Sequence, residues 1–141
     1  MMRVLIPVDG SAPAVRAVEY ALALCAQEGL ALELTLLNVQ PALSGAVASF
    51  IDKSVIGEYH DEQAQAALAE ALAKLEHSGI PYTTEFRIGH HADEIQALVA
   101  DQPIDAIFMG TRGHGGVAGL LLGSVANQVL SVVDVPVTLI K

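Results

Sequence analysis

Hydrophobic residues along this chain form short runs, separated by stretches in which they recur every three or four positions. The first run covers residues 3–8 and is closed by Asp9-Gly10-Ser11, as expected of a strand that is buried on both faces. Similar stretches predict four further strands, at 33–39, 82–88, 106–109 and 137–140. The pattern between them is helical, so strand and helix alternate along the chain.

Four helices are expected between these strands. Ser11 can cap the first helix and Glu28-Gly29 closes it, and its apolar face carries Val15, Val18, Leu22 and Cys25. A long alanine-rich helix over 51–78, a shorter one over 92–101 and one capped by Ser124 follow. Residues 42–50 show no clear period and could form either a flap over a site or a plain loop.

This alternation predicts an open α/β fold, Rossmann-like, in which four helices cover both faces of a mostly parallel five-stranded sheet. A length of 141 residues suits a single domain that spans residues 1–141. The order of the strands stays open, because several orders are compatible with the same succession of elements.

A glycine-rich stretch from Gly110 to Ser124 separates the fourth strand from the last helix. Glycines can arrange successive backbone N–H groups around an anion, because they carry no side chain. Ser124 falls at the N-cap position of the helix, and the free N–H groups of a helix start attract negative charge. The expected guest is a phosphate.

Two other phosphate motifs fit this stretch less well, and a flexible connector is the plain alternative. No lysine precedes Ser124, as a P-loop would require. Residues 113–118 match G-x-G-x-x-[GA], but the loop continues to Gly123 and a single strand follows. A dinucleotide fold would open its helix at once and place this motif near its start.

The glycine spacing, Gly110-x2-Gly113-x9-Gly123-Ser124, resembles the ATP-binding signature of the universal stress protein family. The resemblance covers nearly the whole chain, including residues 4–11, Asn38-Val39, the Gly89 turn and residues 135–140. It implies the strand order 3-2-1-4-5 and a nucleotide site at the carboxyl ends of the first and fourth strands, where the order reverses.

The resemblance also implies a role for each site residue. Phosphates would lie on the N–H groups of Gly113, Gly115, Gly116, Ser124 and Val125, with Mg²⁺ and the ribose near Asp9 and the base near Val8, Val39 and Met109. Pro7, Gly110 and Gly123 are also expected at the site. The residues of the loop themselves offer two candidate cations, Arg112 and His114, each of which could instead be a solvated loop residue. The chain has Ala126 where some relatives offer a hydroxyl, so one phosphate hydrogen bond is expected to be missing.

Charge and residue usage narrow the possible partners. The net charge of −9 gives no positive surface for nucleic acid or an anionic membrane, so a phosphate must be held by local groups. Cys25 is the single cysteine, so a disulfide within the chain is excluded, and its side chain is expected to be buried. No zinc site is expected, because no histidine pair has H-x-x-x-H spacing, and His60 and His77 are expected to be exposed.

The expected function is that of an ATP-binding, nucleotide-dependent sensor or regulator in the stress response. Two alternatives remain: an interaction module of the same fold that binds no nucleotide, and a slow ATP hydrolase or phosphotransferase. A hydrolase of another kind is a separate hypothesis, because Asp9, His114 and Ser124 could approach one another as acid, base and nucleophile. However, Ser124 lacks the G-x-S-x-G elbow, so no catalytic residue is assigned.

The terminal run from Val135 to Ile140 predicts how copies of the chain meet. In the implied order it forms an unprotected sheet edge, which could pair with the same strand of a second copy, and the family resemblance implies the same homodimer. A cytoplasmic protein without membrane insertion is expected, because polar residues and glycines interrupt both long uncharged stretches.

Overall fold

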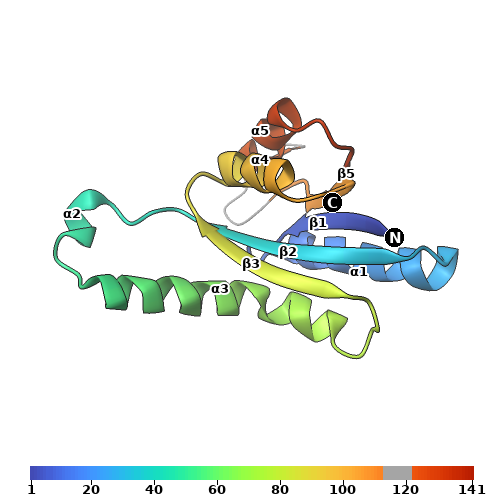
Figure 1. Cartoon of the computed structure of the whole chain (residues 1–141), viewed down its shortest axis with the longest axis horizontal. Helices are drawn as coiled ribbons and strands as arrows, with labels where there is room; N and C mark the ends of the chain where they lie inside the picture. The colour runs from blue at the N-terminus through green and yellow to red at the C-terminus, as the bar shows by residue number, and fades with distance from the viewer. Residues whose placement is uncertain (113–121) are drawn as a thin grey trace.

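The computed structural model describes residues 1–112 and 122–141. Five strands form one sheet in the order β3-β2-β1-β4-β5, and every neighbouring pair is parallel (Figure 1). Their bounds are β1 (Met2–Pro7), β2 (Leu32–Gln40), β3 (Tyr82–Ile88), β4 (Ala106–Gly110) and β5 (Val137–Ile140). The expected strand order is confirmed, and it reverses between β1 and β4.

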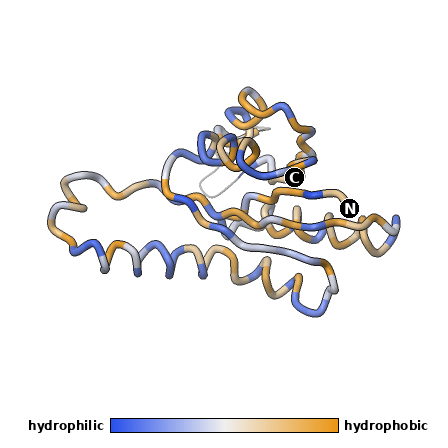
Figure 2. Tube along the Cα trace, in the orientation of Figure 1, coloured by the Kyte–Doolittle hydropathy of each residue, from blue (hydrophilic) through white to orange (hydrophobic). Residues whose placement is uncertain are grey.

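Helices cover both faces of the sheet (Figure 1). On one face, α1 (Ala12–Glu28) and α3 (Lys53–Leu75) pack on one set of strand side chains, which includes Val4, Ile6 and Leu36. On the other, α4 (His91–Asp101) and α5 (Ser124–Val132) pack on the alternate set, which includes Leu5, Leu37 and Ile107. The central strands are therefore apolar on both faces. Figure 2 shows that hydrophobic residues predominate along their traces.

The first helix begins and ends as its sequence predicts. The Ser11 side chain accepts a hydrogen bond from the Ala14 N–H at 3.4 Å, and Pro13 lies in the first turn, where it displaces no helical bond. Gly29 ends the helix with a φ of 67°, which favours glycine because it carries no Cβ. These signals fix the direction in which the chain leaves β1.

The region between β2 and β3 corrects three expectations. A short helix, α2 (Gly45–Ala48), capped by Ser44, adds a fifth helix to the four predicted. The long helix begins at Lys53 and ends at Leu75, inside the predicted range 51–78. His60 was expected to be exposed but is only 2% exposed, because its ring hydrogen bonds to the Gln40 side chain on β2.

The other two expectations about single residues outside the site have mixed outcomes. Cys25 packs at the margin of the core and is partly exposed, so the prediction of a buried thiol was wrong in degree. His77 has a side chain that is 90% exposed, which confirms its predicted exposure. It follows the long helix with a φ of 66° and does not lie within it.

Candidate functional site

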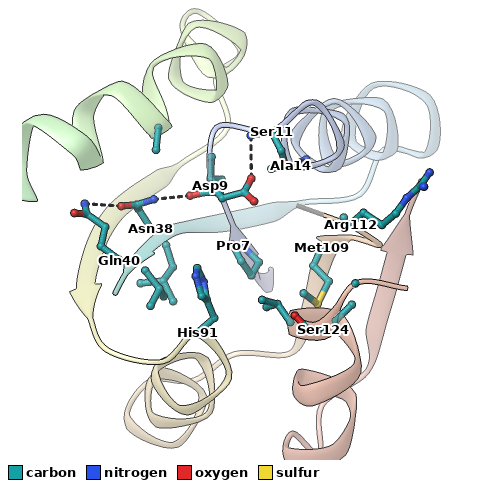
Figure 3. A pocket seen from close by; sticks show the side chains of 18 of the residues that line it. Pro7, Asp9, Ser11, Ala14, Asn38, Gln40, His91, Met109, Arg112 and Ser124 are labelled. Atoms are coloured by element: carbon teal, nitrogen blue, oxygen red, sulfur yellow. Dashed lines mark hydrogen bonds between the residues drawn. The ribbon is translucent and has the colours of Figure 1, made fainter. Parts of the chain in front are cut away.

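A cavity of about 490 Å³ opens at the carboxyl ends of β1, β2 and β4, where the strand order reverses (Figure 3). Helices α1 and α3 lie on one side of it, and α4 and α5 on the other. The cavity is lined by every predicted site residue that the structure describes: Pro7, Val8, Asp9, Val39, Met109, Gly110, Arg112, Gly123, Ser124 and Val125. Gly113, His114, Gly115 and Gly116 lie outside the described residues.

The end of β1 places a carboxylate beside an apolar floor. The Val8 N–H donates to the Leu37 carbonyl at 2.8 Å in the last backbone hydrogen bond between β1 and β2 before the chain turns away. The Asp9 Oδ1 then accepts from the Ser11 N–H at 2.9 Å, which holds the side chain at the start of the turn. Pro7, Val8 and, from β4, Met109 line the cavity as apolar residues and are called its floor below, and Asp9 lines the cavity beside them.

The end of β4 requires a glycine. A Cβ on Gly110 would lie 2.6 Å from the Pro13 Cβ, so the strand could not otherwise approach α1 so closely. Beyond it, the Thr111 N–H donates to the Ile140 carbonyl at 2.8 Å, and the Gly123 N–H donates to the Thr111 carbonyl at 2.6 Å. The second bond ties the two ends of the glycine-rich stretch to each other beside the cavity.

The start of α5 differs from its prediction. The N-cap is Gly123, which has no side chain to cap the helix, and Ser124 is the first helical residue. The first hydrogen bond inside the helix runs from the Asn127 N–H to the Gly123 carbonyl at 3.2 Å. The N–H groups of Ser124, Val125 and Ala126 therefore have no helical partner, and all three residues line the cavity, where they favour an anion.

Positive side-chain charge is scarce in the cavity. Among the described lining residues, Arg112 is the one lysine or arginine, and it is exposed. Among the described lining residues, backbone N–H groups are therefore the main donors available to an anion.

Sequence reasoning missed His91, the first residue of α4, which lines the cavity. Burial lowers the pKa of its imidazole, the nearby Asp9 carboxylate raises it in part, and His90 lowers it further. The signal was the His90-His91 pair directly after the Gly89 turn, because the carboxyl end of β3 lies at the same edge of the sheet as the site.

Two buried polar side chains of the cavity wall were also missed as site residues. Asn38 and Gln40 line the cavity from β2. The two side chains hydrogen bond to each other, and Gln40 also hydrogen bonds to His60 on α3. Polar residues inside an otherwise apolar strand were the available signal, because a buried amide needs a specific partner.

The described residues contain no cluster of three or more His, Cys, Asp or Glu side chains that could hold a metal ion. Asp9 still suits Mg²⁺ that arrives with a nucleotide, because this ion keeps several waters and takes one or two carboxylates together with phosphate oxygens. The cavity also provides the N–H groups that the phosphates need. No helix in the described part of the chain is long and apolar enough to cross a membrane.

Known proteins share this architecture. The chain is 30% identical over 141 residues to universal stress protein MJ0531 of Methanocaldococcus jannaschii, covering 99% of this chain and 81% of the relative. It is also similar to the solved structure of the hypothetical protein MJ0577, with a TM-score of 0.84 and 26% identity over 99% of this chain and 95% of that chain.

Three further solved structures with this fold are nucleotide complexes. A universal stress protein with cAMP is similar with a TM-score of 0.71 and 22% identity, over 99% of this chain and 97% of that chain. An Arabidopsis thaliana family member with AMP is similar with a TM-score of 0.70 and 20% identity, over 100% of this chain and 92% of that chain. The Archaeoglobus fulgidus universal stress protein with dAMP is similar with a TM-score of 0.66 and 21% identity, over 100% of this chain and 98% of that chain.

The sequence profile of the universal stress protein family matches residues 1–141, the whole of the chain. The strand order agrees with this match. The chain belongs to the universal stress protein family.

Proposed function

We propose that this protein binds an adenine nucleotide, ATP with Mg²⁺, and acts as a nucleotide-dependent regulator in the stress response. One observation carries the proposal: a single cavity is lined by the end of β2 and by the first turn of α5, whose N–H groups have no helical partner. The first suits a base and the second suits phosphates, so the two ends match the two ends of a nucleotide.

The base would lie on the apolar floor formed by Pro7, Val8 and Met109. Its edge would meet the backbone N–H and C=O of Val39, and the ribose would lie near Asp9. The solved family members that hold cAMP, AMP and dAMP support an adenine base, because adenosine or its deoxy form is what these ligands share.

The phosphates would accept hydrogen bonds from the N–H groups of Ser124 and Val125 at the start of α5. The predicted contacts from Gly113 to Gly116 and from His114 are part of the proposal but lie outside the described residues. Arg112 would contribute positive charge at the rim. Mg²⁺ would neutralise phosphate charge, and Asp9 would hold it through a carboxylate oxygen or a bound water.

A homodimer is also part of the proposal. β5 is the edge strand of the sheet, and the four residues Val137–Ile140 are all partly exposed. Pairing of this edge with its copy would satisfy the free backbone groups of both strands by two-fold symmetry.

The experiment that tests nucleotide binding has two stages. Protein purified without added nucleotide is denatured, and any released small molecule is identified by chromatography. ATP with Mg²⁺ is then titrated calorimetrically into the emptied protein, with inorganic triphosphate and adenosine as separate controls. Binding of ATP in preference to either half supports the proposal, whereas no heat from any of the three would contradict it.

A further inference from the structure

The backbone of β2 alternates between its two neighbouring strands. The Leu34 N–H donates to the Pro81 carbonyl at 2.9 Å and the Gln40 carbonyl accepts from the Gly89 N–H at 2.8 Å, so even-numbered residues pair towards β3. The Leu37 carbonyl accepts from Val8, so odd-numbered residues pair towards β1. Val39 is the next residue of the odd set, and its N–H and C=O point to where β1 has already ended.

The β1–β2 ladder stops one step short of Val39. In a continued parallel ladder, the Val39 N–H would donate to the Val8 carbonyl. The Asn38 Nδ2 donates to that carbonyl instead, at 2.9 Å. Among the described residues, Val39 takes part in no backbone hydrogen bond beyond those within the helices and strands. Asn38 thus takes the place that the Val39 N–H would hold.

The Asn38 amide is held in this position by Gln40 (Figure 3), which is held in turn by His60 on α3. Its Oδ1 accepts from the Gln40 Nε2 at 2.8 Å, and the same Nε2 donates to the His60 carbonyl at 2.9 Å. The Gln40 Oε1 accepts from the His60 Nδ1–H at 2.7 Å. Asn38, Gln40 and His60 are 4%, 7% and 2% exposed, so these bonds have little competition from water.

We propose that Asn38, held by Gln40 and His60, is a positioning residue that keeps β1 from pairing with Val39 and so reserves the Val39 N–H and C=O for a purine edge. The inference rests on the proposed function. Adenine presents an acceptor at N1 beside a donor at its 6-amino group, which complements one N–H and one C=O. Guanine presents the opposite order, with a donor at N1 and an acceptor at O6, and would be disfavoured.

The direct test replaces Asn38 by leucine, which has a similar size and no donor. In Asn38→Leu, the Val39 N–H is free to pair with the Val8 carbonyl. We expect ATP affinity to fall about tenfold while GTP affinity stays unchanged, because the substitution removes the hydrogen bonds that Val39 makes to the adenine edge. Gln65→Leu, an exposed amide on α3 outside the cavity lining, should leave both affinities unchanged.

Hydrogen exchange of the Val39 amide, followed by NMR without nucleotide, separates positioning from a general loss of structure. In the unmodified protein this amide should exchange faster than that of Leu37, and in Asn38→Leu it should slow to the Leu37 rate. Gln40→Met provides a second variant if Asn38→Leu does not fold. It removes the donor that holds the Asn38 amide, so the preference for ATP over GTP should fall here too.

The two possible failures are distinguishable. If the unmodified protein binds ATP but both variants keep its preference for ATP over GTP, the positioning role is wrong and the proposed function stands. If the unmodified protein binds no ATP, the proposed function is wrong and the inference falls with it.

Discussion

At the scale of single residues, the position of Ser124 changes the chemistry expected of it. As an N-cap, its hydroxyl would be occupied by the helix, but as the first helical residue it offers its N–H to the cavity. Proline is well tolerated at this position of a helix, and the extended Gly123, with φ −75° and ψ 168°, can precede it. A substitution can therefore remove this N–H while keeping the helix.

We expect Ser124→Pro to weaken ATP binding roughly tenfold or more, because it removes a hydrogen bond to a charged phosphate. Ser124→Ala removes the hydroxyl but keeps the N–H, so its affinity should change little. Calorimetric titration of ATP and of adenosine compares the two variants. Equal losses for adenosine and ATP in Ser124→Pro would show that the variant damages the cavity instead of a phosphate contact.

Gly110 and Gly57 form a matched pair for stability. Gly110→Ala would place a Cβ 2.6 Å from the Pro13 Cβ and should lower the free energy of unfolding by about 1–3 kcal/mol. Gly57→Ala meets no atom within 4 Å and lies in α3, so it should raise that free energy by roughly 0.5–1 kcal/mol. Chemical denaturation measures both, and a Gly110→Ala protein as stable as the unmodified one would refute the close approach.

At the scale of elements, the start of α4 carries a pH dependence. Burial lowers the pKa of His91 in the folded protein, so the unfolded chain binds more protons once the pH falls through about 6.5. The free energy of unfolding should therefore decrease on acidification from neutral pH, until the folded state is protonated as well. His91→Gln should weaken this dependence in denaturation curves taken between about pH 5 and 8, and His77→Gln, at an exposed histidine outside the cavity, serves as the control.

The sequence predicted elements better than contacts. Apolar runs and caps located all five strands, because local periodicity reports burial. The strand order came from family resemblance, since pairing between β1 and β4 joins residues about a hundred positions apart. The burial of His60 could not be predicted from α3, because its partner Gln40 lies on β2 and only the folded chain brings them together.

The candidate site was predicted to the same depth. Residues at strand ends and at the start of α5 follow from the glycine spacing and the resemblance, and those that are described do line one cavity. The N-cap at Ser124 was wrong by one residue, because Gly123 supplies the capping carbonyl without a side chain. Asn38 and His91 carried only weak signals, a polar residue in an apolar strand and a histidine pair after Gly89, because their roles depend on neighbours from other elements.

At the scale of the whole molecule, the proposed dimer can be separated from the fold of one chain. The Ile107 N–H donates to the Pro136 carbonyl, and the Thr111 N–H donates to the Ile140 carbonyl. The backbone groups of even-numbered residues in β5 therefore face β4, and the backbone N–H and C=O of Leu139 face away from the sheet. Leu139→Pro removes the leucine side chain together with the backbone N–H that points away from β4. Leu139→Ala also removes the packing of that side chain but keeps the N–H. Light scattering should give one chain mass for the first and two for the second.

A concentration-independent single-chain mass for the unmodified protein would contradict the dimer outright. An unchanged two-chain mass in Leu139→Pro would instead place the interface elsewhere. Neither result bears on the nucleotide cavity, because β5 lines no part of it.

The central claim is that an adenine nucleotide occupies the cavity between Val39 and the start of α5. Its most direct test follows backbone amide shifts by NMR as ATP with Mg²⁺ is added to the emptied protein. We predict saturable shifts that are largest at Val39 and at Ser124, Val125 and Ala126, the residues of the two proposed ends. Shifts confined to other parts of the chain, or none at millimolar ATP, would contradict the account.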